Sequence, residues 1–466
     1  MPVATCRTAS LSALALAIAI APWTPAAGAA EVAAQPRADG YHGIWFTLGQ
    51  RSEHGDKYSG GLGTYTADHI PTAIHVPEVN KTFFVYGGTV PGQRHLLAMI
   101  SYYDHARGVV PRPVIVHDKQ GVDDPHDNPS LALDDRGHLW VFVSGRANLR
   151  PGFKYRSVEP HAIDRFEQVA SATMAYPQPW FVPGQGFLHC FTKYTRGREL
   201  YWETSADGRT WSEAKKLAGF GGHYQVTNVR QGALVTAFNW HPGGNVDKRT
   251  NLYFLRTDDL GRTWKTASGQ AAAAPLAEVG NAALVRDYAA EGRLVYINDI
   301  QFDREGRPVI FYITSGGYKP GPEAGPREWT IARWDGRAWQ FHPVATSDHN
   351  YDMGSLYVED DAWRIIGPSG PGPQPWGTGG EMALWISTDS GAAWRKVRDL
   401  TARSQFNHSY ARRPVRAHPD FYAFWADGNP NEFSPSRLYF TNRAGDHVWR
   451  LPAAMTEEFS RPEVAW

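Results

Sequence analysis

The sequence predicts an all-β protein built from repeated sheets, and three observations support this fold class. Aromatic residues make up 13% of the 466 residues, and 46 Gly and 33 Pro supply many turns. Short runs rich in Val, Ile, Tyr, Phe and Trp alternate with these turns. One turn pattern, with Asp, Gly and Trp at matching positions, occurs three times. Repetition of one supersecondary unit is typical of closed β architectures.

The charge balance limits the kinds of partner. The chain has 47 Lys and Arg against 47 Asp and Glu, so its formal net charge is zero. Proteins whose whole surface serves nucleic acid or anionic membranes usually carry a basic excess. We therefore expect a monomer with no nucleic-acid or membrane partner. A local basic pocket stays compatible with the neutral total.

The first 29 residues are predicted to be a secretory signal peptide. Arg7 precedes an apolar run from Leu11 to Ala21, which is too short to span a bilayer, and Ala27-Gly28-Ala29 forms a small-residue cleavage site. A retained N-terminal anchor is the alternative. We expect a secreted or periplasmic protein whose single domain spans residues 30–466. Removal of the leader would leave Cys190 as the sole cysteine, which excludes an intrachain disulfide.

Residues 205–211, 257–264 and 387–394 share one turn motif. They resemble the Asp-box, or BNR repeat, of sialidase-type β-propellers. In such a turn the Asp carboxylate can accept backbone N–H bonds, Gly takes the positive φ, and Trp packs between sheets. The motif supports a propeller fold but says little about activity, because it is a structural turn. Degenerate relatives of the motif start at Asp134, Asp303 and Asp335.

The spacing of the strands predicts a single β-propeller of seven four-stranded blades. Candidate first strands recur at intervals of roughly 50 to 75 residues, about the length of one blade. They start near His69, His126, Tyr176, Tyr224, Asn298, Tyr351 and His408. The longest interval contains an Ala-rich insertion, residues 270–292, which we expect to form a short helix or a loop.

Propeller topology indicates which polar residues face a ligand. In propellers with Asp-boxes the boxes join the third and fourth strands on one face, and the resemblance places the ligand site on the opposite face. The innermost strands begin on that face and the second strands end there, because neighbouring strands alternate in direction. The residues collected at these positions are mostly His, Tyr, Lys and Arg, and they come from different blades.

Such a set suits an anionic sugar, and the reaction it fits best is β-elimination at a uronic acid. Cations neutralise the carboxylate and so acidify the proton on C5, a base removes that proton, and an acid protonates the leaving oxygen on C4. Tyr and His can serve as either acid or base. A glycoside hydrolase usually needs two close carboxylates. Asp127, Asp299 and Asp352 lie at candidate positions but suggest no such pair.

Five segments look like the BNR-4 propeller family, namely residues 57–65, 79–88, 127–129, 176–180 and 222–225. That family includes seven-bladed ulvan lyases and related rhamnose–glucuronate lyases. The resemblance implies a secreted polysaccharide lyase whose partner is an anionic polysaccharide. Sialidases resemble one another in an early Arg-Ile-Pro, where this chain has His69-Ile70-Pro71. A sialidase-like glycoside hydrolase and a non-catalytic glycan-binding propeller remain the alternatives.

The resemblance also implies roles for individual residues. His126 matches the catalytic histidine of the family, and Tyr176 is placed as the tyrosine that acts as acid or base. Tyr224 matches a further tyrosine of the pocket. Tyr194 is the reserve for the role given to Tyr176. Whether His126 or Tyr176 is the base is left open.

The carboxylate-binding position departs from the family pattern. Lys193 stands where the family has an arginine, and lysine lacks the bidentate fork of a guanidinium. Arg146 stands where some members have a second histidine. Lys248 and Arg249 are predicted to be cations at the rim, with a solvated loop as the alternative. The residues predicted to bind substrate are Asn128, Arg146, Tyr194, Arg196, His223, His241, Lys248, Arg249 and His408.

We expect no cofactor, with a divalent cation as the open alternative. Histidine and carboxylate side chains are common metal ligands, and the candidate face carries several of them. His126, Asp127, His223 and His241 are the residues that could supply such ligands. Their spacing matches no metal-binding motif, so the sequence predicts no metal centre at these positions.

Overall fold

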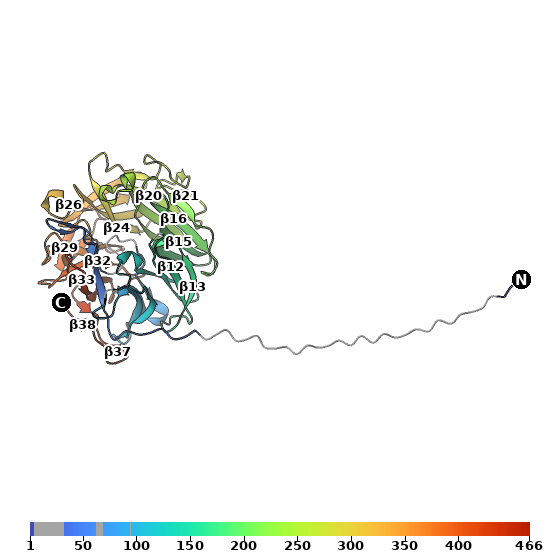
Figure 1. Cartoon of the computed structure of the whole chain (residues 1–466). Coiled ribbons are helices and arrows are strands. Elements are labelled where there is room, and N and C mark those ends of the chain that lie inside the picture. The colour runs from blue at the N-terminus through green and yellow to red at the C-terminus, as the bar shows by residue number, and fades with distance from the viewer. Residues whose placement is uncertain (4–31, 62–68, 94, 147) are drawn as a thin grey trace.

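The computed structural model describes residues 1–3, 32–61, 69–93, 95–146 and 148–466. In these residues the chain forms antiparallel sheets set around a central axis, as Figure 1 shows. The all-β propeller predicted from the sequence is confirmed. The predicted signal peptide lies outside the described residues, apart from residues 1–3.

Seven sheets of four or more strands follow one another along the described chain. Consecutive strands pair within each sheet, so strand direction alternates from the axis to the rim. The first blade contains β5 (Ala73–Val76), β6 (Lys81–Gly88), β7 (Leu97–Asp104) and β9 (Val114–Asp118). The second contains β10 (Pro129–Leu133), β11 (Leu139–Val143), β12 (Gly152–Ser157) and β13 (Phe166–Ala172). The third contains β14 (Ala175–Val182), β15 (Gly186–Tyr194), β16 (Arg198–Ser205) and β17 (Lys215–Ala218).

The later blades follow the same plan. The fourth contains β18 (Gln225–Arg230), β19 (Ala233–Trp240), β20 (Thr250–Thr257), β21 (Trp264–Lys265), β22 (Ala271–Ala272) and β23 (Leu284–Arg286). The fifth contains β24 (Leu294–Phe302), β25 (Pro308–Ser315), β26 (Arg327–Trp334) and β27 (Trp339–Ser347). The sixth contains β28 (Ser355–Val358), β29 (Trp363–Gly370), β30 (Glu381–Ser387) and β31 (Arg395–Asp399). The seventh contains β32 (Asn407–Arg412), β33 (Ala423–Gly428), β35 (Leu438–Thr441), β36 (Val448–Arg450) and β38 (Glu463–Val464).

The ring closes through β1 (Gly43–Thr47), which lies between the first and the seventh blade. It pairs with β6 of the first blade and with β34 (Ser434–Ser436), a strand within the seventh blade segment, and it also pairs with β4 (Ser59–Gly60). β1 therefore connects the first and last blades of the ring. Two small sheets complete the structure, β2 (Arg51–Ser52) with β3 (Gly55–Asp56), and β8 (Val110–Pro111) with β37 (Phe459–Ser460).

Regular helix in the described residues is confined to short 3-10 turns. These are η1 (Pro77–Val79), η2 (Pro125–Asp127), η3 (Pro242–Gly244), η4 (Val246–Lys248) and η5 (Pro322–Ala324). None of the helical segments in the described chain has the length and apolar character needed to cross a membrane. The Ala-rich insertion, residues 270–292, forms no helix. Its strand β23 pairs with β20 of the fourth blade, next to the short β21, which pairs with the same strand.

The Asp-box turns form as predicted. Asp207 Oδ1 accepts hydrogen bonds from the N–H groups of Arg209 (2.9 Å) and Thr210 (2.8 Å). Gly208 has a φ of 73°, and Trp211 Nε1 donates to the carbonyl of Gly208 at 2.7 Å. The other two boxes repeat this bond: the backbone N–H of Thr263 donates to Asp259, and that of Ala393 donates to Asp389. Each box joins a third and a fourth strand, so the boxes share one side of the ring, the turn face.

Large aromatic side chains fill the spaces between neighbouring blades. Trp140 of the second blade meets Phe187 of the third edge to face, with ring centroids 5.0 Å apart. The Asp-box residue Trp211 meets Phe142 in the same interface at 5.8 Å. Aromatic contacts of this kind bury large apolar areas. These contacts pack neighbouring blades against each other. The side of the ring opposite the turn face, where the inner strands begin, is called the ligand face.

Candidate functional site

Aromatic side chains from several blades meet on the ligand face near the axis. The ring of Tyr176 lies 5.5 Å from the rings of both His126 and Tyr224, measured between centroids. Tyr351 lies 5.1 Å from Tyr296 and 5.3 Å from Tyr58. We call these six residues, His126, Tyr176, Tyr224, Tyr296, Tyr351 and Tyr58, the axial cluster. The predicted neighbours His126, Tyr176 and Tyr224 are therefore in one place.

Tyr176 sits at an irregular position in its strand. Its φ is 54°, an unusual value for a residue with a bulky side chain. The pairing of β14 with β15 shifts register between Ala175 and Gln178, which marks a β-bulge. A bulge re-aims a side chain, and here the backbone N–H of Tyr176 is held by Ser144 Oγ at 3.1 Å. Strain of this kind is typical of functional positions.

His126 is positioned by a carboxylate. It lies in η2, whose N-cap residue Asp124 accepts a hydrogen bond from the backbone N–H of His126 and contacts its Nδ1. A proton on Nδ1 directed at Asp124 leaves Nε2 as the basic nitrogen of the ring. The Asp–His pair thus resembles the arrangement that orients a general base in many enzymes.

Two arginines complete the network behind His126. Arg146 pairs with Asp124, and Arg150 lies 2.8 Å from Asp124 and 2.5 Å from Asp127. Burial opposes ionisation of Asp124, but the bonds and charges of His126 and Arg146 outweigh it and lower the pKa of this carboxyl below its ordinary value. Arg146, predicted to bind substrate, therefore holds the carboxylate that orients His126.

Arg198 places a guanidinium beside tyrosines of the third and fourth blades. It is paired directly across the sheet with Tyr194, and its Cζ lies 5.4 Å from the ring of Tyr194 and 6.0 Å from that of Tyr224. The hydroxyls of Tyr194 and Tyr176 are 3.4 Å apart. Burial and nearby Tyr224 raise the pKa of Tyr194, and Arg198 opposes that rise.

Lys193 lies on the opposite side of β15 from Tyr194. Adjacent residues of a strand point to opposite faces of the sheet, so Lys193 points away from Tyr194. Its Nζ lies 5.3 Å from the ring of Tyr201 and 5.9 Å from that of Phe191. Arg196 is exposed in the turn between β15 and β16. Arg198, rather than Lys193, is the cation beside the ring of Tyr194.

Arg249 is a buried cation rather than a rim residue. It is 1% exposed, and its Cζ lies 4.6 Å from the ring of Tyr296, 4.9 Å from Tyr224 and 5.4 Å from Tyr351. It donates hydrogen bonds to the Val246 carbonyl at 2.9 Å and to the Tyr58 hydroxyl at 3.3 Å. Cation–π contacts stabilise a buried charge of this kind. Its neighbour Lys248 is exposed in η4.

Lys57 adds a third cation, supplied by the segment before the first blade. It pairs with Asp247, and its Nζ lies 4.4 Å from the ring of Tyr58. Burial, and then the positive charges of Arg249 and Arg198, lower the pKa of Lys57 to about 8. A lysine with a lowered pKa beside two arginines marks a region of concentrated positive charge.

Three predicted residues are held by the fold instead of facing the cluster. The ring nitrogens of His223 contact the backbone of Asn239 (2.8 Å) and Phe220 (3.4 Å). His408 contacts Ser404 and accepts a bond from Trp425, each at 3.0 Å. Asn128 is fully buried, and its side-chain oxygen packs against Gly87, where any larger residue would collide with it. Burial lowers the pKa of His223 to about 4 and that of His408 to about 3, so both are neutral at pH 7.

His241 stays with the cluster. Its ring lies 4.8 Å from that of Tyr224, and it is fully buried with neither ring nitrogen hydrogen-bonded among the described residues. Buried polar atoms normally have partners, which water or a ligand can provide. His126, Asp127, His223 and His241 do not form a metal-binding group among the described residues, because Lys119 and Arg150 bind Asp127 and backbone atoms bind His223.

Two sequence signals could have located the missed residues. Third strands begin on the ligand face just as second strands end there, and Arg198 is the first residue of β16. Tyr296 was missed because β24 starts at Leu294, four residues before the predicted start at Asn298. Lys57 and Tyr58 lie in residues 57–65, the first segment that resembles the BNR-4 family. They precede the first blade, and the search of strand starts and ends did not include that segment.

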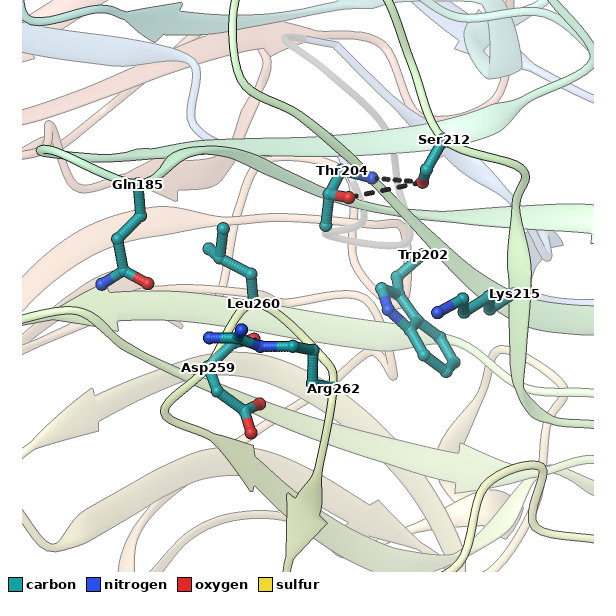
Figure 2. A pocket seen from close by; sticks show the side chains of 8 residues that line it. All are labelled: Gln185, Trp202, Thr204, Ser212, Lys215, Asp259, Leu260 and Arg262. Atoms are coloured by element: carbon teal, nitrogen blue, oxygen red, sulfur yellow. Dashed lines mark hydrogen bonds between the residues drawn. The ribbon is translucent and has the colours of Figure 1, made fainter.

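A separate hollow of about 380 Å³ lies between the third and fourth blades (Figure 2). Its walls come from the Asp-box hairpins and the outer strands, and it contains none of the predicted site residues. The lining residues are Gln185, Trp202, Thr204, Ser212, Lys215, Asp259, Leu260 and Arg262. Since Asp259 is the carboxylate of the second box, this hollow belongs to the turn face and not to the axial cluster.

Comparison with known proteins identifies the class. A model of the BNR-4 family, described as "BNR repeat-containing family member", matches residues 99–347. This match covers more than half of the chain, so the chain belongs to that family. The residues that carry the match include the second to fifth blades and the tyrosines of the axial cluster from Tyr176 to Tyr296.

Solved structures agree in fold. The structure of an ulvan lyase of polysaccharide lyase family 25 superposes with a TM-score of 0.69 at 15% identity, covering 88% of this chain and 96% of that one. The same values hold for that family's ulvan lyase bound to -[GlcA(1-4)Rha3S]-. No sequence among curated proteins matches this chain. At this identity the likeness establishes the fold alone.

The network around Asp124 leads to a stability prediction. We expect Asp124→Asn to lower the free energy of unfolding by about 2 kcal/mol, because it leaves Arg146 without its carboxylate and Arg150 with one carboxylate in place of two. The lowered pKa of Asp124 means that its stabilisation is present above the ordinary carboxyl pKa of about 4 and is lost as pH falls through the lowered value. The difference between wild type and variant should therefore shrink in acid.

Urea unfolding at neutral pH and in acid measures this difference. Asp135→Asn serves as the control, since Asp135 is exposed on the turn face. A constant difference across the pH range would contradict the assigned role of Asp124.

Proposed function

We propose that this protein is a polysaccharide lyase that cleaves a uronic-acid polymer of the rhamnose–glucuronate type by β-elimination. The observation that carries the proposal is the meeting of His126, Tyr176 and Tyr224 with a concentration of positive charge on the ligand face. The fold shared with ulvan lyases supports the same substrate class. No step of the proposed reaction uses a cofactor.

The cations suit the first requirement of the reaction. The carboxylate of the uronate must be neutralised before the C5 proton becomes acidic enough to remove. Arg198 presents a guanidinium beside Tyr194 and Tyr224, and a guanidinium can bind a carboxylate in bidentate fashion. Lys57 and the buried Arg249 add positive potential to the same place. We assign the carboxylate contact to Arg198.

The acid and the base come from His126 and Tyr176. The Asp124 carboxylate holds Nδ1 of His126, which suits Nε2 to proton transfer. Tyr176 lies beside His126, and its hydroxyl is 3.4 Å from that of Tyr194, a contact through which Arg198 can favour the phenolate. One of the pair removes the C5 proton and the other protonates the leaving oxygen on C4.

The carboxylates of the ligand face do not favour a glycoside hydrolase. Asp352 is buried and accepts backbone bonds from Gly379 (2.7 Å) and His349 (2.8 Å). Asp299 accepts bonds from the backbone of Ile300 (2.8 Å) and Leu356 (2.9 Å). Asp127 is paired with Lys119 at 2.7 Å. A hydrolase needs two carboxylates across a sugar bond, and these three serve the fold.

A panel of ulvan, gum arabic and bacterial rhamnose–glucuronate polymers tests the proposal. We expect ultraviolet absorbance from the unsaturated uronate. His126→Ala and Tyr176→Phe should each lower kcat/KM by about 100-fold or more, because each removes a proton-transfer group. Arg198→Ala should do the same through loss of the carboxylate contact. Lys193→Ala, on the other face of β15, is the matched control and should stay near wild type.

The outcomes separate the alternatives. Reducing sugar without unsaturated product would indicate a glycoside hydrolase. Glycan binding without product, weakened in His126→Ala, would indicate a binding propeller. Absence of both binding and product across the panel would contradict the substrate class.

Lys57 makes the reaction sensitive to alkali. We expect kcat/KM to fall as pH rises through about 8, because Lys57 loses the charge that attracts the carboxylate. The folded pKa lies below the ordinary lysine value, so the unfolded chain binds more protons in this range and rising pH stabilises the fold at this group. The loss is therefore not unfolding. In Lys57→Arg the charge persists, and this alkaline limb should move to higher pH, whereas Lys248→Arg should leave it unchanged.

We also propose that residues 30–466 form the mature chain, exported to the periplasm or the medium as a monomer. The support is the charged and apolar leader with its small-residue cleavage site. Mass spectrometry of the exported protein should give an N-terminus near residue 30, and light scattering should give the mass of one chain. An intact leader on the exported protein, or a dimer mass, would contradict the respective part.

A further inference from the structure

Three histidines gather on the turn face, remote from the axial cluster in the fold. His75 lies in β5, and His105 directly follows β7, so both belong to the first blade. His418 lies between β32 and β33 of the seventh blade, and Asp420 is two residues further on. The group therefore spans the junction between the first and last blades. We call it the junction cluster.

Three side chains of the junction cluster have ligand atoms near one another, and the ring of His75 packs beside them. The ring centroid of His418 lies 3.7 Å from that of His105 and 4.9 Å from that of His75. The rings of His75 and His105 are 5.3 Å apart. One ligand atom each of His105, His418 and Asp420 lie within 4.8 Å of one another. Ligand atoms around a zinc ion, each about 2.0–2.1 Å from the metal, stand closer together than this, so binding would draw these side chains inward.

Two of these imidazoles have buried nitrogens without a partner. His75 Nε2 and His105 Nδ1 are buried and make no hydrogen bond among the described residues, and His75 as a whole is 9% exposed. The other nitrogen of His105, Nε2, contacts Thr82 Oγ1 at 2.8 Å. A hydrogen bond on the far nitrogen fixes the tautomer and ring orientation of a metal-binding histidine. Unsatisfied buried polar atoms otherwise carry a cost.

Neutral imidazole is the form that binds a metal, and each of these histidines can supply one ring nitrogen in that form. Asp420 supplies the negative charge that a divalent cation requires.

We propose that His75, His105, His418 and Asp420 bind one divalent transition-metal ion, with Zn²⁺ as the best match. Three imidazoles and a carboxylate are borderline ligands that suit Zn²⁺ in four-coordinate geometry, whereas Ca²⁺ and Mg²⁺ prefer all-oxygen sites. The site is structural, because the four side chains belong to the turn face and no group of the proposed reaction lies among them.

The ion would clamp the ring where its two ends meet. The same junction already contains a parallel bridge between Ile74 and Val415, with backbone bonds from His75 to Val415 (3.0 Å) and from Val415 to Ala73 (2.8 Å). A metal bound by both blades adds a crosslink that exists only in the closed ring. Binding to the folded state alone raises stability by mass action.

Zinc binding to chelator-treated full-length protein tests the proposal. Calorimetric titration with Zn²⁺ should give one ion per chain, and the unfolding temperature should rise with zinc and fall again with a chelator. His105→Ala and Asp420→Asn should each weaken zinc binding by about 10-fold or more. His447→Ala is the control, since His447 is exposed on the same blade as His418 and should bind zinc like wild type.

Cobalt(II) gives a second measurement that needs no variant. The wild-type protein loaded with Co²⁺ should show the intense visible bands of a four-coordinate site, and Zn²⁺ should displace them. Absence of stoichiometric zinc binding and of these bands would overturn the proposal. Zinc binding that is retained in a folded His105→Ala and His418→Ala double variant would overturn it too. Lyase activity is not the readout, so failure here is distinct from failure of the proposed function.

Discussion

The architecture depends on the hydrogen bonds that close the ring at β1. This strand pairs with β6 near the N-terminus and with β34 near the C-terminus, so the first and last blades become neighbours. Every inner strand then points at one axis, and side chains separated by hundreds of residues can meet. Lys57 reaches Asp247, and Tyr58 reaches Tyr351, only because the circle is complete. The junction cluster lies where the same two blades meet.

A second constraint is the positive charge held within the axial cluster. Arg249 is buried among the rings of Tyr224, Tyr296 and Tyr351, a setting in which the π faces of the rings replace part of its hydration. Burial, and then repulsion from Arg249 and Arg198, lower the pKa of Lys57 to about 8. A bound carboxylate would relieve this repulsion. A bound anion would therefore stabilise the arrangement of charges in this pocket.

The neutral net charge of the chain hides a division between the two faces. Carboxylates such as Asp207, Asp259 and Asp389 serve the turns, where backbone N–H groups bind them. Cations gather with phenols on the opposite side. The carboxylates that do reach the ligand face are engaged by neighbours, as Asp124 is by His126 and two arginines. A charge total averages over these local settings and so cannot describe them.

The sequence by itself determined the features that arise from local chemistry. An Asp-box turn is specified by a few adjacent residues, and strand periodicity follows from alternation, so the propeller and the starts of most inner strands were predictable, as was the meeting of His126, Tyr176 and Tyr224. Tertiary structure alone decided which neighbours of these residues face the site. Lys193 and Tyr194 are adjacent in β15, so their side chains lie on opposite sides of the sheet. Arg198 pairs with Tyr194 and lies on the same side as that tyrosine. Burial against other strands placed His223 and His408 in the framework. Long-range packing sets register and burial, and no local pattern in a single chain encodes them.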